Sequence, residues 1–156
     1  MDIKHEYGLL AQKYTLPSYD ELDKEFEFLY FTPVSEIRFV SRFVRRRICD
    51  RISMFAHTLQ GLLQPNPTSF ISLEESSFLT DEDKNKASLL IKELMSLSRE
   101  SSLLDINFDE KKDAYFIREA YASVKKIRND LFSLLGKVKH GWETKVKEES
   151  DERYFG

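Results

Sequence analysis

The chain has 156 residues, with 24 Lys and Arg against 27 Asp and Glu, so its formal net charge is −3. This length fits one domain, and 41% hydrophobic with 33% charged residues is typical of a globular protein rather than a disordered one. The single Cys excludes an intramolecular disulfide framework and a Cys-based zinc finger.

The first third of the chain predicts two short helices and the start of a long one. Pro17 ends the first, because a residue that precedes proline avoids the α region. Ser18 and Glu21 have the spacing of a capping box, which predicts the start of the second helix. Thr32-Pro33 is a typical start for the third, since Thr can cap and Pro is tolerated in the first turn.

From this start an apolar stripe continues without a break to Pro65, at a spacing close to the 3.6 residues of an α-helical turn. Its members are Ile37, Val40, Val44, Ile48, Ile52, Phe55, Leu59 and Leu62. Residues 65–69 are rich in turn formers and predict a linker. Ser72 with Glu75 predicts a further capped turn, and Thr80, followed by three acidic residues, predicts the start of a helix that ends near Leu104.

The last predicted helix begins at Asn107, with Glu110 completing a capping box. It carries a heptad seam suited to shallow packing along another long helix. The seam residues are Ile117, Ala120, Val124, Ile127, Leu131, Leu134 and Val138. We therefore predict an all-α fold: an antiparallel helical bundle of three long helices plus shorter N-terminal helices. Residues 1–144 form its single domain, and residues 145–156 form a charged, flexible tail.

The sequence shows no recognisable catalytic, cofactor or metal motif. Its three histidines, His5, His57 and His140, lie far apart and lack the spacing of a metal site. The five glycines are scattered, so no glycine-rich loop can cradle a phosphate. The longest apolar run, residues 28–31, is too short for a membrane-spanning helix, and the N-terminus lacks the apolar stretch of a secretory signal. We expect a cytoplasmic, non-catalytic protein without cofactors that does not enter the membrane.

The third helix carries the most distinctive pattern, six arginines and no lysine: Arg38, Arg42, Arg45, Arg46, Arg47 and Arg51. On a helical wheel the stripe formed by Arg38, Arg42, Arg45 and Arg46 lies beside the apolar arc. Arg47 and Arg51 fall on the arc itself, which predicts that at least one is mostly buried in a buried or half-buried ion pair with a carboxylate, such as one from the second helix.

The basic stripe has a structural and two functional interpretations. Residues 33–63 carry six Arg against two acids, a charge of +4, and residues 1–32 carry three Lys against seven acids, a charge of −4. The two segments can therefore neutralise each other. The stripe can instead bind phosphates of a nucleic acid, or an acidic protein partner.

Phe39 and Phe43 lie outside the main apolar arc of the third helix. They belong either to a wide core or to an exposed patch for a partner or for self-association. The sequence thus predicts a helical interaction protein, an adaptor or a subunit of a larger assembly, whose partner is another protein or a second copy. The alternative is a nucleic-acid-associated protein that uses the arginine stripe.

One stretch shows a loose similarity to a known family. Residues 37–52, followed by Pro65 and then by Phe78-Leu79-Thr80-Asp81-Glu82, are loosely similar to helical domains of the GINS replication-factor subunits. This similarity covers about a third of the chain. It assigns neither family membership nor a role to any residue.

Overall fold

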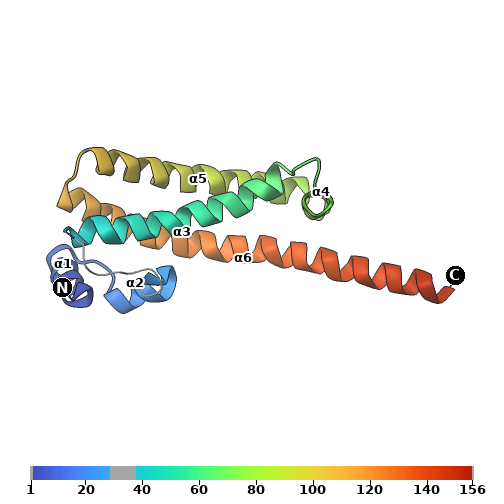
Figure 1. The fold of residues 1–156 in the computed structure, drawn as a ribbon, viewed down its shortest axis with the longest axis horizontal. Coiled ribbons are helices and arrows are strands. Elements are labelled where there is room, and N and C mark those ends of the chain that lie inside the picture. Colours follow the sequence, from blue (N-terminus) through green and yellow to red (C-terminus); the bar gives the residue numbers. More distant parts are fainter. Residues whose placement is uncertain (1, 29–37, 156) are drawn as a thin grey trace.

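A computed structural model describes residues 2–28 and 38–155, and over these residues the fold is entirely α-helical (Figure 1). The helices are α1 (Ile3–Tyr14), α2 (Tyr19–Phe26), α3 (Val40–Leu63), α4 (Phe70–Ser77), α5 (Asp81–Ile106) and α6 (Glu110–Phe155). Helices α3, α5 and α6 pack together as an antiparallel bundle, which confirms the predicted fold class. In the described part of the chain, no helix is both long and apolar enough to cross a membrane.

The two N-terminal helices begin and end for local reasons. Asp2 caps α1 by accepting from two backbone N–H groups, and α1 ends in a left-handed residue, Thr15, two positions before Pro17. The capping box predicted for Ser18 and Glu21 at the start of α2 is confirmed. Both helices lie against one end of the bundle (Figure 1).

Helix α3 starts later than the sequence predicts. Thr32 and Pro33, the predicted helix start, lie outside the described residues. The structure shows that Arg38 and Phe39 precede the helix, and that Phe39 is its N-cap without a side-chain hydrogen bond. From Val40 onward the predicted apolar stripe forms the core face of α3.

Two of the predicted helix caps are wrong by a few residues. Ser69, not Ser72, caps α4, whereas the hydroxyl of Ser72 lies inside the helix and accepts from the backbone of the preceding linker. Asn107 ends α5 rather than starting α6, and Asp109 accepts the first-turn N–H bond of α6 instead. The prediction at Thr80 is confirmed, as a capping box with Asp83.

Helix α6 has 46 residues, about 69 Å at 1.5 Å per residue, and only part of it lies in the bundle. All seven residues of the predicted heptad seam are buried. Beyond them α6 continues as a helix through residues 145–155 and projects past the other helices (Figure 1). These residues were predicted as a flexible tail; they are helical here, and their flexibility stays a prediction.

The accessible surface of the protein is larger than that of a compact monomer of the same mass. The accessible surface is 10392 Å², whereas a compact monomer of 18.4 kDa exposes roughly 8,000 Å². The excess is expected of an elongated bundle from which one helix extends.

Candidate interaction surfaces

One arginine of α3 lies inside the bundle, where it joins the three long helices. The Arg45 side chain is 0% exposed. Its Nε donates to Asp113 Oδ1 of α6 at 2.8 Å, and its two terminal nitrogens donate to the Ser101 carbonyl and to Asp105 Oδ1 of α5, each at 2.7 Å. Ser41 donates to the second oxygen of Asp113 at 3.1 Å. This network fixes the relative positions of α3, α5 and α6 at one end.

The position of Arg45 corrects the helical-wheel interpretation, which placed it on the exposed basic stripe. Ser41, Arg45, Ile48 and Ile52 follow one another at spacings of four, three and four residues, so they form a single row along α3. Helices α5 and α6 both pack against α3, and together they cover this row. The core arc of α3 is therefore wider than its apolar residues indicate.

The network shifts the pKa values of its three charged members. Burial alone lowers the pKa of Arg45, but the hydrogen bond to Asp105 and the charge of Asp113 outweigh it and raise the pKa overall. The hydrogen bond from Arg45 holds the pKa of Asp105 below its usual range. Burial raises the pKa of Asp113, against the opposing effect of Arg45.

The arginines predicted to be buried lie nearer the surface than Arg45. Arg47 and Arg51 are half-buried, with 27% and 26% of their side chains exposed. Arg51 contacts Glu27, the C-cap residue of α2, at 3.6 Å, and Arg47 contacts a carboxylate three residues further along α3. The ion pair predicted with the second helix is thus made by the half-buried Arg51, whereas the fully buried ion pairs of this helix are made by Arg45, for which none was predicted, with carboxylates of α5 and α6.

The rest of the basic stripe meets aromatic rings and one acid. Phe39 and Phe108 are in contact, with ring centroids 4.6 Å apart. The guanidinium of Arg38 lies 5.4 Å from the Phe39 centroid, and that of Arg42 lies 5.0 Å from the Phe108 centroid. Arg46 is exposed and shares Asp105 with the buried network. Arg38 and Arg42 therefore remain as the candidates for binding an anionic partner.

Phe39 and Phe43, the two candidate aromatic residues, differ in position. Phe39 is exposed at the start of α3, beneath Arg38. Phe43 is half-buried and packs against the core. The guanidinium carbon of Arg47 lies 5.3 Å from the centroid of the Phe43 ring. Of these two rings, Phe39 is the one that is exposed to a partner.

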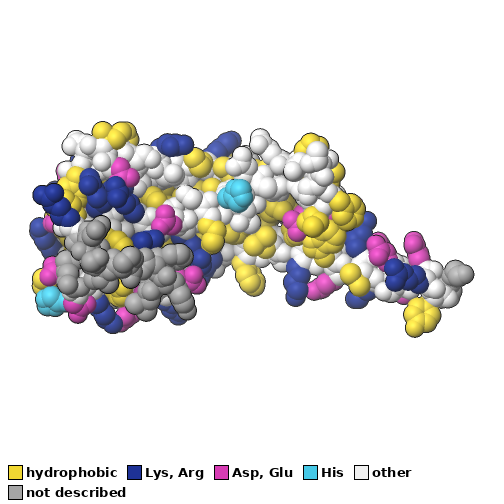
Figure 2. Space-filling model, in the orientation of Figure 1, with side chains coloured by type: hydrophobic (Ala, Val, Ile, Leu, Met, Phe, Trp, Pro, Cys, Tyr) yellow, Lys and Arg dark blue, Asp and Glu magenta, His cyan; other side chains and the backbone are white. Residues whose placement is uncertain are grey.

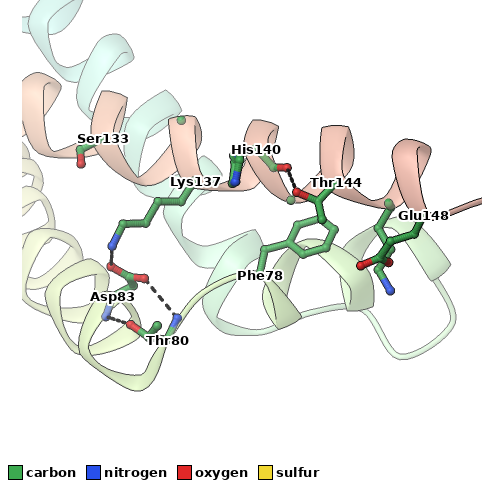
Figure 3. A pocket seen from close by; sticks show the side chains of 11 residues that line it. Phe78, Thr80, Asp83, Ser133, Lys137, His140, Thr144 and Glu148 are labelled. Carbon is green, nitrogen blue, oxygen red and sulfur yellow. Dashed lines mark hydrogen bonds and ion pairs between the residues drawn. The ribbon is translucent and has the colours of Figure 1, made fainter. Parts of the chain in front are cut away.

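A groove of about 630 Å³ lies where the start of α5 meets the middle of α6 (Figure 3). The Phe78 ring packs directly on the backbone of Gly141 and edge-on to Trp142. Beside it, Lys137 donates to Asp83, which also accepts from the backbone of Thr80. The hydrogen bond from Lys137 lowers the pKa of Asp83. These polar groups are therefore already paired with each other by hydrogen bonds. Among the described residues, no three His, Cys, Asp or Glu side chains could hold a metal ion.

A second groove, of about 670 Å³, lies at the turn between α5 and α6 and is mostly apolar. Its exposed apolar side chains are Leu103, Ile106 and Tyr115, and Ile106 is 85% exposed. We call this region the hairpin-end groove. No pattern in the sequence indicates this groove, because its residues continue the composition of the helices that contain them.

One side of α6 is covered by α2 near Arg128 and, in the described part of the chain, is exposed further along the helix. Arg128 donates to Glu25 of α2 at 2.7 Å, so α2 lies over this side of α6. Phe132, Leu135, Lys139 and Val146 follow on the same side at helical spacing, and all four are exposed. Phe132 is 81% exposed. We call these four residues the uncovered side of α6. In the space-filling view, hydrophobic side chains protrude along this edge of the molecule (Figure 2).

No family model, no curated protein and no solved structure matches this chain.

Proposed function

We propose that this protein is a cytoplasmic, non-catalytic helical interaction protein, an adaptor or a subunit of a larger assembly. The observation that carries the proposal is the uncovered side of α6, where large apolar side chains stay exposed directly beyond the point at which α2 ends its contact. The hairpin-end groove adds a second apolar surface at the other end of the bundle.

The energetics favour a protein partner at such surfaces. Burial of a fully exposed Phe, Leu or Ile side chain contributes about 1.5–3 kcal/mol. Exposed apolar clusters rimmed by charged residues are typical of protein–protein interaction sites. Lys139 and Glu143 on α6, and Asp109 and Lys112 at the hairpin-end groove, supply such rims.

Photo-crosslinking in the native cell tests this proposal. A photoreactive amino acid replaces Phe132 or Ile106, and for comparison Lys126 or Lys92, which are exposed polar positions on α6 and α5. We expect discrete protein adducts from the cytosolic fraction at the apolar positions and not at the polar ones. Equal adducts at all four positions, or none at either apolar position, would contradict the proposal.

Nucleic-acid binding is the second candidate, and one observation favours it. Arg38 and Arg42 lie over a pair of rings, the exposed Phe39 and the half-buried Phe108, and arginines combined with exposed aromatic rings are a feature of single-strand binding surfaces. Against it, Arg45 is buried and Arg46 shares a carboxylate, so fewer cations face outward than the sequence indicates.

Fluorescence anisotropy with labelled single-stranded and duplex oligonucleotides separates the two candidates. We expect no binding tighter than about 10⁻⁴ M at physiological salt, the weak end of non-specific association. Micromolar binding that falls steeply with salt and disappears in the double variant R38E/R42E would favour the nucleic-acid function.

A further inference from the structure

The last third of α6 makes few contacts with the rest of the described chain. Residues 143–154 are all exposed, and Lys145, 3.7 Å from Glu74 of α4, makes a contact with the body of the bundle. Isolated helices this short are only marginally stable in water, because nucleation is costly. A partner that packs along residues 143–155 would stabilise them.

The charges on this part of α6 are arranged in two blocks. Residues 137–147 carry four Lys and one Glu, whereas residues 148–152 carry four acids and no cation. When two copies of the helix lie antiparallel, the acidic block of each lies at the level of the basic block of the other, and Glu149 is the acid nearest to the side that carries Lys139. A parallel arrangement would instead bring like charges together, which is destabilising.

The uncovered side of α6 and the projecting end of α6 also match in length and chemistry. The stretch from Phe132 to Glu143 and the projecting stretch 143–155 each span about 16–18 Å. The first carries exposed Phe132, Leu135 and Lys139, and the second carries exposed Val146 and Tyr154 among the acids. Each stretch thus carries exposed apolar groups, and the acids of the second are opposite in charge to the lysines of the first.

From this complementarity we propose that the protein forms an antiparallel homodimer through α6. The projecting residues 143–155 of each copy lie on the uncovered side of α6 of the other copy. Tyr154 then packs against Phe132 and Leu135 of the second copy, and Glu149, the member of the acidic block nearest to this side of the helix, lies beside its Lys139. Both contacts form twice about a twofold axis, as a closed dimer requires. This inference rests on the proposed interaction function and names the partner as a second copy.

Sedimentation equilibrium of the full chain over a wide concentration range tests dimerisation. We expect a reversible dimer that F132D weakens at least about tenfold, because the lost burial of one phenyl ring has that magnitude. The matched control is I106D, which places the same charge at an equally exposed site on the other end of the bundle. Circular dichroism checks that both variants remain helical.

A charge-swap experiment tests the pairing of the two blocks. The single variants E149K and K139E should each dimerise less than the wild type. An equimolar mixture of the two should form a heterodimer, since each reversed charge then meets an opposite charge. Failure of the mixture to associate more strongly than either variant alone would overturn the antiparallel arrangement.

Intermolecular disulfides test the register directly, in a C49S background. The double variant L135C/Y154C should form a covalent dimer under mild oxidation, whereas either single substitution should do so far less. The two positions lie about 28 Å apart along one helix, so they cannot bridge within one chain. A wild type that stays monomeric at all concentrations would contradict the dimer. Position-specific crosslinks to a different protein would still support the interaction function.

Discussion

The two ends of the bundle differ in how the same helix, α6, is used. At the end near α1 and α2, Asp113 of α6 is buried and holds Arg45, and α2 covers the neighbouring side through Arg128. At the other end, α6 leaves the bundle and exposes apolar and charged groups to solvent. The comparison shows that one continuous helix can contribute both a buried seam and a solvent-exposed surface. The boundary between the two lies where the helices packed against α6 end.

The largest effect is expected at the buried end. Arg45→Ala strands the buried carboxylate of Asp113, and breaking a buried ion pair from one side costs about 3–5 kcal/mol. Urea unfolding should show this loss. The exposed Arg46, which contacts the same Asp105 as Arg45, is the control, and Arg46→Ala should cost less than about 1 kcal/mol. Equal losses would mean that the network does not stabilise this end.

The free end has its own point of close packing, at Gly141. An added Cβ would overlap the Phe78 ring, which must then move away from Trp142. We expect Gly141→Ala to lower the free energy of unfolding by about 1–3 kcal/mol. Gly136, five residues earlier on α6, has open space around it, so Gly136→Ala should stabilise the helix by about 0.5–1 kcal/mol. Thermal melts that rank the two variants in the opposite order would contradict the packing at Phe78.

The pH dependence of stability sharpens the comparison at the buried end. Because Arg45 lowers the pKa of Asp105 in the folded protein, this carboxylate stabilises the fold above about pH 4. The stabilisation is lost as the pH falls through the lowered pKa. Asp105 is 38% exposed and therefore screened, so Asp105→Asn should cost about 1 kcal/mol at neutral pH.

Urea unfolding at a series of pH values measures this difference. The gap between wild type and Asp105→Asn should be constant near neutral pH and should close at strongly acidic pH. Glu100→Gln, an exposed change on the same helix outside the Arg45 network, is the control variant. A gap for Asp105→Asn that persists in strong acid would show that ionisation of Asp105 is not its cause.

The smallest effect is expected at Arg51, which the helical wheel placed in the apolar arc. Its pair with Glu27 has 26% and 52% of the two side chains exposed and a separation of 3.6 Å. Arg51→Ala should therefore cost below about 1 kcal/mol, well under the loss at Arg45. A loss in differential scanning calorimetry as large as that of Arg45→Ala would restore Arg51 as the main ionic contact of α3.

Much of the fold follows from local patterns in the sequence. The period of the apolar residues in α3 and α6, the capping residues Ser18 and Thr80, and the linker 65–69 all predict structure correctly. These features depend on groups within one or two helical turns, so the local sequence is sufficient. The caps at Ser69 and Asp109 were missed because several nearby residues can accept the same backbone hydrogen bonds.

The candidate surfaces depended on the tertiary structure. A helical wheel measures angles around one helix and cannot tell that two neighbours cover the row containing Ser41 and Arg45. The same limit applies to Phe132 and Leu135, whose exposure is decided by where α2 ends and not by their own sequence. Sequence alone therefore determined which helices form. The packing of α2, α5 and α6 decided which of their charged and apolar side chains stay in water, because burial is a property of neighbours that lie far away in the chain.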